Sequence, residues 1–530
     1  MIFKSLYPDV TIPEVALTSF VLQRARQLGA KPALIDGPSG RTITYEQLPG
    51  LIARVAAGLA QRGLRKGDRL AIFSPNLPEY AIAFHAVASL GGVVTTANPL
   101  YTARELANQL NDSRARFLLT VPPLLATARE AAGQSSVKQI FVFGEDEGAT
   151  PFAALLQNDG QPPNVTIDPH EDLVALPYSS GTTGLPKGVM LSHYNLVAQL
   201  CEIDGIPDTQ LIAESDTVLA FLPFFHIYGM AAFMNLSLYQ GATVVTMPRF
   251  DLEHYLELVQ KYHVSVLHLV PPIALALAKH PIVANYDLSK IRGAFSAAAP
   301  LSETVANALF DRVGFRVSQA YGLTESGATH LGPNLPDKIK PASAGRVVPN
   351  TECKIVDVVS GTTLAPHQQG EIWVRGPTVM RGYLNRPDAT AETIDAEGWL
   401  RTGDIGYADE DGYFYLVDRA KELIKYKGYQ VAPAELEAVL LAHPAIADAA
   451  VIGIADEEAG EVPKAFVVRK GEITAEELIA FVATRVAPHK KVRAVEFIDQ
   501  LPKSLTGKLL RRVLIERERE QARVVRAEAQ

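Results

Sequence analysis

Tyr178-Ser-Ser-Gly-Thr-Thr-Gly-Leu-Pro-Lys-Gly188 is the most informative stretch of the chain, and it directly follows an apolar, strand-like run at residues 173–176. Glycine lets backbone N–H groups turn toward an anion without clashes from a Cβ atom. The groups suited to a polyphosphate are Ser179, Ser180, Gly181, Thr182, Thr183 and Lys187. A Walker A loop is excluded, because Pro186 precedes the lysine and Gly188 follows it. A lone Gly-Thr-Thr-Gly is more often an ordinary turn, but the whole segment favours phosphate binding.

Strand-sized apolar runs alternate with helical patterns through roughly the first 400 residues. Such runs lie at residues 69–73, 218–222, 243–247 and 264–270. One face of a helix is marked by Leu252, Tyr255, Leu256 and Val259, which are spaced at i, i+3, i+4 and i+7. This alternation predicts an α/β fold of largely parallel sheets covered by helices on both faces.

The C-terminal part of the chain has a different pattern. A helix is expected at residues 433–441, then strands at 449–454 and 465–468, a second helix, and a strand at 492–497. Thr474 and Glu477 have the spacing of a capping box at the start of that second helix. We therefore expect a large domain at residues 1–417 and a small α+β domain at residues 418–530.

Composition limits the possible functions. A chain of 530 residues is too long for one ordinary core, and its 48% hydrophobic and 20% charged residues are typical of a soluble globular protein. The formal net charge of -8 does not favour nucleic-acid binding. The single basic cluster, Lys508 with Arg511 and Arg512, is equally well explained as the solvated start of a helix.

Targeting signals and cysteines point to the cytoplasm. The N-terminus lacks a signal-peptide pattern, and the most apolar stretch, residues 264–278, is too short and interrupted to span a membrane. The two cysteines, Cys201 and Cys353, could form one disulfide, but nothing marks a disulfide framework, so we expect a reducing compartment.

The segment at residues 178–188 resembles the phosphate-binding signature of the adenylate-forming superfamily, which includes acyl-CoA synthetases, peptide-synthetase adenylation domains and beetle luciferases. Further motifs of that superfamily follow in its order over nearly the whole chain: Phe221-Leu-Pro-Phe-Phe-His-Ile-Tyr-Gly229, Gln319-Ala-Tyr-Gly-Leu-Thr-Glu-Ser326, Gly398-Trp-Leu-Arg-Thr-Gly-Asp-Ile405, residues 418–437 and Pro502-Lys-Ser-Leu-Thr-Gly-Lys508. Taken singly, most of these would be core segments, helix caps or turns. Together they imply a large N-terminal domain and a small, mobile C-terminal lid.

The resemblance also implies roles for individual residues. The catalytic set would be Lys187, His226, Thr324, Glu325 and Lys508, with Glu325 holding Mg²⁺. ATP or AMP would contact the loop residues above together with Tyr321, Gly322, Thr324, Asp404, Arg419, Lys421, Lys425 and Gln430. Within this set Tyr321 would stack on adenine, and Asp404 would accept both ribose hydroxyls. Asp418 would be the hinge, and coenzyme A would meet Arg249, Lys427 and Gly428.

The implied reaction forms an acyl-adenylate from a small carboxylic acid and ATP, and then an acyl-CoA thioester, with release of AMP and pyrophosphate. Within the superfamily the chain most resembles 4-coumarate or cinnamate:CoA ligases. The acyl pocket would be lined by Tyr228, Ala232, Ala297, Ala298, Gly322, Ala328 and Thr329, which are mostly small and apolar, as a flat aromatic acid needs. Plant enzymes of this kind usually carry Gly-Gly-Ala-Pro or Gly-Ala-Ala-Pro where this chain has residues 297–300, so the preference for a hydroxylated ring stays open.

Three alternatives remain. A fatty-acyl-CoA synthetase or a luciferase-like oxygenase would share the adenylation chemistry but take a different acid. A non-catalytic nucleotide sensor should lack Lys187, Glu325 or Lys508, all of which are present. An adenylation module that serves a carrier protein fits poorly with the residues expected to meet coenzyme A. The sequence does not indicate the oligomeric state.

Overall fold

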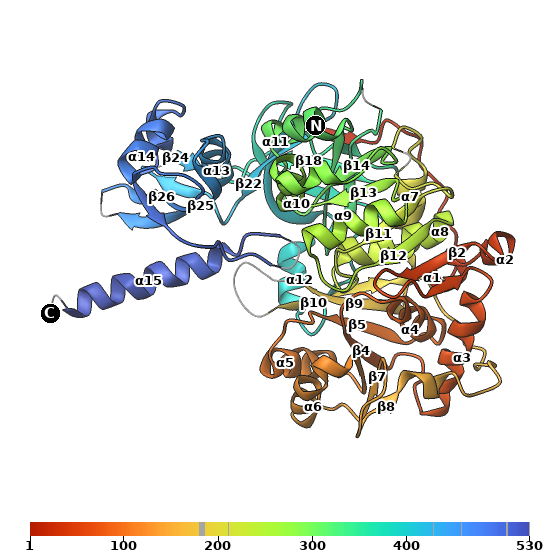
Figure 1. The fold of residues 1–530 in the computed structure, drawn as a ribbon. Coiled ribbons are helices and arrows are strands. Elements are labelled where there is room, and N and C mark those ends of the chain that lie inside the picture. Colours follow the sequence, from red (N-terminus) through yellow and green to blue (C-terminus); the bar gives the residue numbers. More distant parts are fainter. Residues whose placement is uncertain are drawn as a thin grey trace.

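The computed structural model describes residues 1–179, 186–209, 211–335, 337–427, 429–456, 458–504 and 507–528, without the side chains of Gln430 and of residues 522–528. Figure 1 shows a large body that contains three sheets, and a smaller body that stands beside it and joins it after β22. One hydrophobic core runs from Leu17 to Phe414, and a separate core runs from Ile424 to Val492. The expected large N-terminal and small C-terminal domains are therefore confirmed.

The first large sheet has eight strands and carries the phosphate segment at one side. Its order is β20 (Gly382–Tyr383), β10 (Lys187–Ser192), β9 (Leu173–Ser179), β5 (Val93–Ala97), β4 (Arg69–Phe73), β6 (Phe117–Thr120), β7 (Gln139–Val142) and β8 (Thr150–Pro151). The strands from β9 to β8 are parallel, whereas β10 and β20 are antiparallel to their neighbours. The phosphate signature lies at the end of β9, at the start of β10 and in the residues between them.

The second large sheet has nine strands. Its order is β17 (Arg346–Val347), β16 (Gly327–Leu331), β15 (Val317–Leu323), β14 (Gly293–Ser296), β13 (Val266–Leu269), β11 (Thr217–Ala220), β12 (Thr243–Thr246), β2 (Pro32–Asp36) and β3 (Thr42–Thr44). The strands from β15 to β2 are parallel. The strands expected at residues 69–73, 218–222, 243–247 and 264–270 all exist; the first has the predicted bounds, and the ends of the other three differ by at most two residues.

Helices of the large domain cover these sheets. They are α1 (Leu17–Val21), α2 (Ala25–Leu28), α3 (Leu48–Gln61), α4 (Pro78–Ser89), α5 (Ala103–Ser113), α6 (Leu125–Gly133), α7 (His193–Asp204), α8 (Ser237–Gln240), α9 (Leu252–Lys261), α10 (Pro271–Lys279), α11 (Glu303–Val313) and α12 (Pro387–Thr393), with the π-helix η3 (Gly229–Leu236) before α8. Helix α9 buries Tyr255, Leu256 and Val259, as the spacing of its apolar residues predicts.

A third sheet of the large domain departs from the expectation of largely parallel strands. It consists of β1 (Ile2–Lys4), β18 (Glu352–Val356), β19 (Gly370–Arg375), β21 (Leu400–Ala408) and β22 (Phe414–Arg419), and all its pairs are antiparallel. Burial alternates along β19, so this sheet has one face in the core and one face partly in solvent. Two of its pairs, β18 with β19 and β21 with β22, join strands that are consecutive in the chain, and antiparallel pairs of this kind need no crossover helix.

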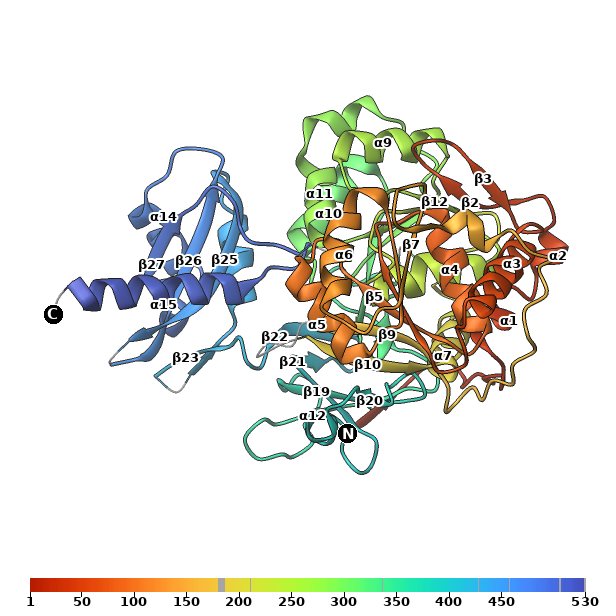
Figure 2. The same cartoon turned by 90° about the horizontal axis from the view of Figure 1, so that it is seen from below.

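The small domain is one sheet between two layers of helix. The strands are β24 (Tyr429–Val431), β23 (Ile424–Tyr426), β26 (Gly460–Arg469), β25 (Ile446–Asp456) and β27 (Ala494–Phe497). Helices α13 (Pro433–Leu441) and α14 (Ala475–Ala483) pack on one face, and α15 (Arg511–Glu528) lies on the other, as Figure 2 shows. Helix α13 has the expected bounds, and Thr474 and Glu477 form the expected capping box.

Cys201 and Cys353 are both free. Within the described residues, no helix combines the length and the apolar character that crossing a membrane requires.

Candidate active site

The phosphate segment joins two strands that run side by side. Strands β9 and β10 pair so that Ser179 lies opposite Lys187. This register brings both ends of the segment together, which is the arrangement a backbone cradle for an anion needs. The predicted contacts Ser180, Gly181, Thr182 and Thr183 lie outside the described residues.

Lys187 lies against an aromatic ring. Its ammonium nitrogen is 4.0 Å from the centroid of Tyr383 in the neighbouring strand β20. A cation above the face of a phenol ring is attracted by the ring quadrupole and keeps its full charge. The contact with Tyr383 therefore holds the Lys187 side chain at the start of β10 and does not neutralise its charge.

Glu325 lies in the tight turn between β15 and β16, next to Thr324. Tyr383 donates its hydroxyl hydrogen to Oε1 of Glu325 at 2.8 Å, and Met380 N–H donates to the Glu325 carbonyl oxygen at 2.8 Å. Gly322 is needed beside this turn, since a Cβ there would lie 2.1 Å from the carbonyl oxygen of Gly327. The turn is thus fixed through both its backbone and its carboxylate.

Asp404 forms a second polar centre. It lies on β21 directly opposite Arg419 of β22, and Arg419 Nε is 3.3 Å from Asp404 Oδ1. Tyr321 donates its hydroxyl hydrogen to Asp404 Oδ2 at 2.7 Å. Burial raises the pKa of Asp404, and Arg419 and the Tyr321 hydroxyl oppose that shift. The stacking of Tyr321 on adenine stays a prediction.

Lys508 reaches the large domain from the small one. The preceding residue, Gly507, has a φ of 74°, and a Cβ at that position would lie 2.9 Å from Cγ of Pro272 at the start of α10. The loop is closed on itself, because Lys508 N–H donates to Ser504 Oγ at 3.1 Å. Glycine is required here both for the left-handed backbone and for the close approach.

Charges around Lys508 identify its neighbours. Burial, and then the charge of Arg419, lower the pKa of Lys508 to about 8, while Asp404 and Glu325 act in the opposite direction. Burial and the charge of Lys508 lower the pKa of His226 to about 4. The charges of Asp404 and Glu325 therefore act on Lys508, and the charge of Lys508 acts on a neutral His226, although the four residues come from four separate motifs.

The remaining predicted contacts on the small domain are exposed or lie outside the described side chains. Lys421, Lys425 and Lys427 are exposed, and Lys427 adopts a φ of 46°. Gly428 lies outside the described residues; Gln430 is in β24, but its side chain is not described. Arg249 is exposed on the large domain, just after β12. The roles of these residues stay predictions.

Tyr228, predicted to line the acyl pocket, lies at the edge of a buried aromatic cluster. The Tyr228 hydroxyl lies 3.3 Å from Nδ1 of His268, and His268 packs against Phe233 and Phe295 with ring centroids 5.1 and 6.1 Å apart. Burial lowers the pKa of His268 to about 3, so this cluster is uncharged at neutral pH. The sequence did not single out His268, because a lone histidine in an apolar strand gives no signal of its surroundings.

The small residues expected in the same pocket occupy different environments. Ala232 is buried in the π-helix η3, Ala297 and Ala328 are half-buried, and Ala298 is exposed with a φ of 73°. Thr329 is buried, and its hydroxyl oxygen lies 3.0 Å from Nδ1 of His330. Their contact with an acyl group stays a prediction.

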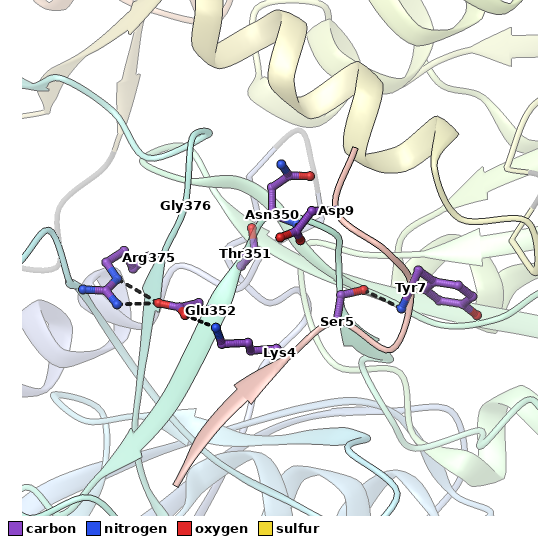
Figure 3. A pocket seen from close by; sticks show the side chains of 9 residues that line it. All are labelled: Lys4, Ser5, Tyr7, Asp9, Asn350, Thr351, Glu352, Arg375 and Gly376. Carbon is purple, nitrogen blue, oxygen red and sulfur yellow. Dashed lines mark hydrogen bonds and ion pairs between the residues drawn. The ribbon is translucent and has the colours of Figure 1, made fainter. Parts of the chain in front are cut away.

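A separate hollow of about 360 Å³ lies between the N-terminal segment and β18, and contains none of the predicted residues. Figure 3 shows that Glu352 pairs with both Lys4 and Arg375 there, with Lys4 Nζ 2.9 Å from Oε1 and Arg375 Nε 3.0 Å from Oε2. These charges join β1 to the third sheet, so we assign the hollow a structural role.

Comparison with known proteins agrees with the family resemblance inferred from the sequence motifs. A family model described as AMP-binding enzyme matches residues 21–384, and one described as AMP-binding enzyme C-terminal domain matches residues 435–508. The chain is 43% identical over 527 residues to 4-coumarate--CoA ligase 2 of Petroselinum crispum, which covers 97% of this chain and 96% of the relative. It is 44% identical over 525 residues to 4-coumarate--CoA ligase of Pinus taeda, which covers 97% of both chains.

Solved structures give the same result. ATP-bound MatB from Rhodopseudomonas palustris has a TM-score of 0.87 at 28% identity, covering 95% of this chain and 99% of that one. The anthranilate CoA ligase AuaEII in complex with anthranoyl-AMP also has a TM-score of 0.87, at 27% identity, covering 96% and 98%. The resemblance to adenylate-forming enzymes is thereby confirmed. The chain belongs to the family of AMP-binding enzymes.

Proposed function

We propose that the protein joins a small aromatic carboxylic acid, of the cinnamate or 4-coumarate type, to coenzyme A through an acyl-adenylate. The observation that carries this proposal is that the residue before Lys508 lies against Pro272 of the large domain, where the charges of Asp404 and Glu325 act on the lysine. The relatives named 4-coumarate--CoA ligase support the choice of acid. The half-buried Tyr228 supports it independently, because it stands at the edge of the buried aromatic cluster of His268, Phe233 and Phe295, and an aromatic acid packs well against such a ring.

In the first step a carboxylate oxygen of the acid attacks the α-phosphorus of ATP, and the bond from that phosphorus to the pyrophosphate oxygen breaks. Two anions must approach each other, so positive charge and positioning carry the catalysis. The Lys508 ammonium group would bridge the carboxylate and the α-phosphate. Asp404 would accept the ribose hydroxyls, and neutral His226 would donate to the charge that builds up near the acid.

Glu325 fits a magnesium ion. Its Oε1 accepts a hydrogen bond from Tyr383, which leaves Oε2 for a cation, and Mg²⁺ needs few protein carboxylates when phosphates supply other ligands. The ion would neutralise phosphate charge when bound. Lys187 and the segment that it follows would hold the departing pyrophosphate.

In the second step the coenzyme A thiolate attacks the acyl carbon, and the bond from that carbon to the AMP oxygen breaks. Lys508 has no role in this step, so we propose that the small domain turns about Asp418 and brings the exposed face of Lys425 and Lys427 to the site. Asp418 supports a boundary between domains 1–417 and 418–530. Its Oδ1 accepts from Arg419 N–H at 2.8 Å, and its Oδ2 accepts from Ala434 N–H at 2.9 Å, at the start of α13. A cytoplasmic location would supply ATP and coenzyme A.

The test is an assay of the purified protein with ATP, Mg²⁺, coenzyme A and a panel of acids: cinnamate, 4-coumarate, benzoate, hexanoate and palmitate. We expect AMP and acyl-CoA to form fastest with the cinnamates. Faster turnover of hexanoate or palmitate would keep the mechanism and contradict the aromatic pocket. Absence of AMP with every acid would contradict the proposal as a whole.

A further inference from the structure

Tyr383 lies between Lys187 and Glu325, the two residues predicted to serve the polyphosphate and its cation. Neither the motifs nor the mechanism above assigns Tyr383 a role of its own. It is buried in β20, with its backbone paired to Val189 of β10. Its N–H donates to Thr390 Oγ1 of α12 at 2.9 Å, and Gly382 before it has a φ of 137°. The ring is therefore fixed from two sides before any substrate binds.

The side chain of Tyr383 contacts a cation and an anion at once. Its hydroxyl donates to Glu325 Oε1 at 2.8 Å, while the Lys187 ammonium lies 4.0 Å from its ring centroid. Within the described residues, no ion pair joins Lys187 directly to Glu325.

This arrangement solves a specific problem. A lysine and a glutamate that both serve one polyphosphate would tend to pair with each other and so neutralise the charges that the substrate and its cation need. A tyrosine between them interacts with both groups in different ways. Its ring face attracts the ammonium group, and its hydroxyl donates one hydrogen bond to the carboxylate. One carboxylate oxygen and the full positive charge then stay available.

We propose that Tyr383 is a positioning residue that orients Glu325 toward a divalent cation and Lys187 toward the polyphosphate while keeping the two from pairing. The proposal rests on the roles given above to Glu325 and Lys187. Groups that orient a metal-binding carboxylate commonly change metal affinity 10–100-fold when they are removed. Tyr383→Phe removes the hydrogen bond and keeps the ring, whereas Tyr383→Leu removes both.

The experiment measures Mn²⁺ binding by the loss of the free Mn²⁺ electron paramagnetic resonance signal, in the presence of a non-hydrolysable ATP analogue. We expect Tyr383→Phe to weaken Mn²⁺ binding about tenfold. Half-saturating Mg²⁺ in adenylation should rise by a similar factor, and thioester formation from a supplied acyl-adenylate should be unchanged. Tyr383→Leu should in addition raise the KM for ATP several-fold.

Tyr7→Phe is the matched control. Tyr7 donates to Asp208 Oδ2 at 3.1 Å, and Lys338 Nζ lies 2.8 Å from the same oxygen, so the three groups form a similar trio outside the site. Its Mn²⁺ binding should equal that of the unaltered protein. The Figure 3 view shows Tyr7 in the N-terminal segment.

Two results would overturn the proposal: Mn²⁺ binding by Tyr383→Phe that equals the unaltered protein, or equal loss of both half-reactions together with a lower melting temperature. The second result would mean that Tyr383 only packs the site. If the unaltered protein formed no acyl-adenylate with any acid, the proposed function would fail instead. The Mn²⁺ measurement needs only cation and nucleotide, so it would still decide the role of Tyr383.

Discussion

The two sides of the candidate site are built in different ways. On the large domain, Asp404 and Glu325 are held by strand pairing and by tyrosine hydroxyls, so their positions follow from the folded sheets. On the small domain, Lys508 follows Gly507, which lies against Pro272, and the Lys508 N–H donates to Ser504 Oγ. We propose from this comparison that the large domain supplies a preformed nucleotide site, whereas the small domain supplies one movable charge.

The loop of Lys508 is anchored at its far end by buried charges. Arg511, three residues later, donates from Nη2 to both carboxylate oxygens of Glu437 at 2.7 Å and also pairs with Glu422. Burial raises the pKa values of Glu437 and Asp418, and the charge of Arg511 opposes both shifts. Arg511 therefore connects the loop to α13 and to the region of the hinge.

Lys508→Ala should give the largest effect. Loss of one charge that stabilises the transition state commonly costs about 10²–10³ in rate, so adenylation should fall by that factor. Thioester formation from a supplied acyl-adenylate should be unchanged, because the second step does not use this lysine. Single-turnover assays of each half-reaction measure both quantities.

Lys503→Ala is the control, since Lys503 lies in the same loop and pairs with Asp448 on the small domain. It should leave both half-reactions unchanged. Equal loss of both half-reactions in Lys508→Ala would remove the distinction drawn between the two sides of the site.

Arg511→Met should destabilise the small domain by about 3–5 kcal/mol, because it leaves buried carboxylates without their partner. Chemical denaturation, followed by a probe in the small domain, measures the change. The loss should shrink as pH falls toward 5, since protonation removes the unpaired charges of Glu437 and Asp418.

Arg512→Met provides the matched comparison, because Arg512 is exposed and makes only an i,i+4 pair with Glu516. Its effect should stay below about 0.5 kcal/mol. A similar loss from both arginines would contradict the account of Arg511 as the anchor of the loop.

The pH dependence of adenylation should report Lys508. Its pKa of about 8 lies below the usual lysine value, so the catalytic ammonium is charged below pH 8 and neutral above it. The value of kcat/KM for ATP should fall about tenfold per pH unit above pH 8. His226, with a pKa of about 4, should give no break near pH 6.5.

Lys508→Arg tests this assignment, because a guanidinium stays protonated over the whole range. The value of kcat/KM for ATP in Lys508→Arg should be lower than in the unaltered protein but should not change with pH above pH 8. A fall above pH 8 that persisted in Lys508→Arg would assign the titration to another group.

Ala298→Gly should give the smallest effect. Ala298 adopts a φ of 73°, which L-residues with a Cβ avoid, so glycine should stabilise the large domain by about 0.5 kcal/mol. Ala299→Gly, at the next residue, should instead destabilise it by about 0.5–1 kcal/mol. Thermal denaturation of the pair measures both, and a loss in Ala298→Gly would contradict the assignment of strain to that residue.

Much of the fold could be predicted from local patterns. The apolar spacing of α9, the capping box of α14 and the bounds of α13 depend on residues close in sequence, and all three were predicted correctly. The antiparallel third sheet was missed, because its strands gather from the N-terminus and from residues 352–419. Pairing over such distances leaves no local signal.

The candidate site was predictable only where motifs name its residues. Tyr383 was missed because its partners Glu325 and Lys187 are distant in sequence and come together only when β20 pairs with β10. The unassigned segment between two recognised motifs, residues 380–385, was the available signal. The solvated helix start that was one explanation of the basic cluster does not hold for Arg511, because its side chain pairs with Glu437 and Glu422, and such pairing cannot be read from a run of basic residues.

The most direct test of the central claim is exchange of labelled pyrophosphate into ATP by the purified protein without coenzyme A. An acyl-adenylate intermediate requires that exchange depend on a cinnamate-type acid and proceed in the absence of the thiol. We predict rapid exchange with the acid, none without it, and loss of exchange in Lys508→Ala. Exchange that required coenzyme A, or that proceeded equally without any acid, would contradict the account.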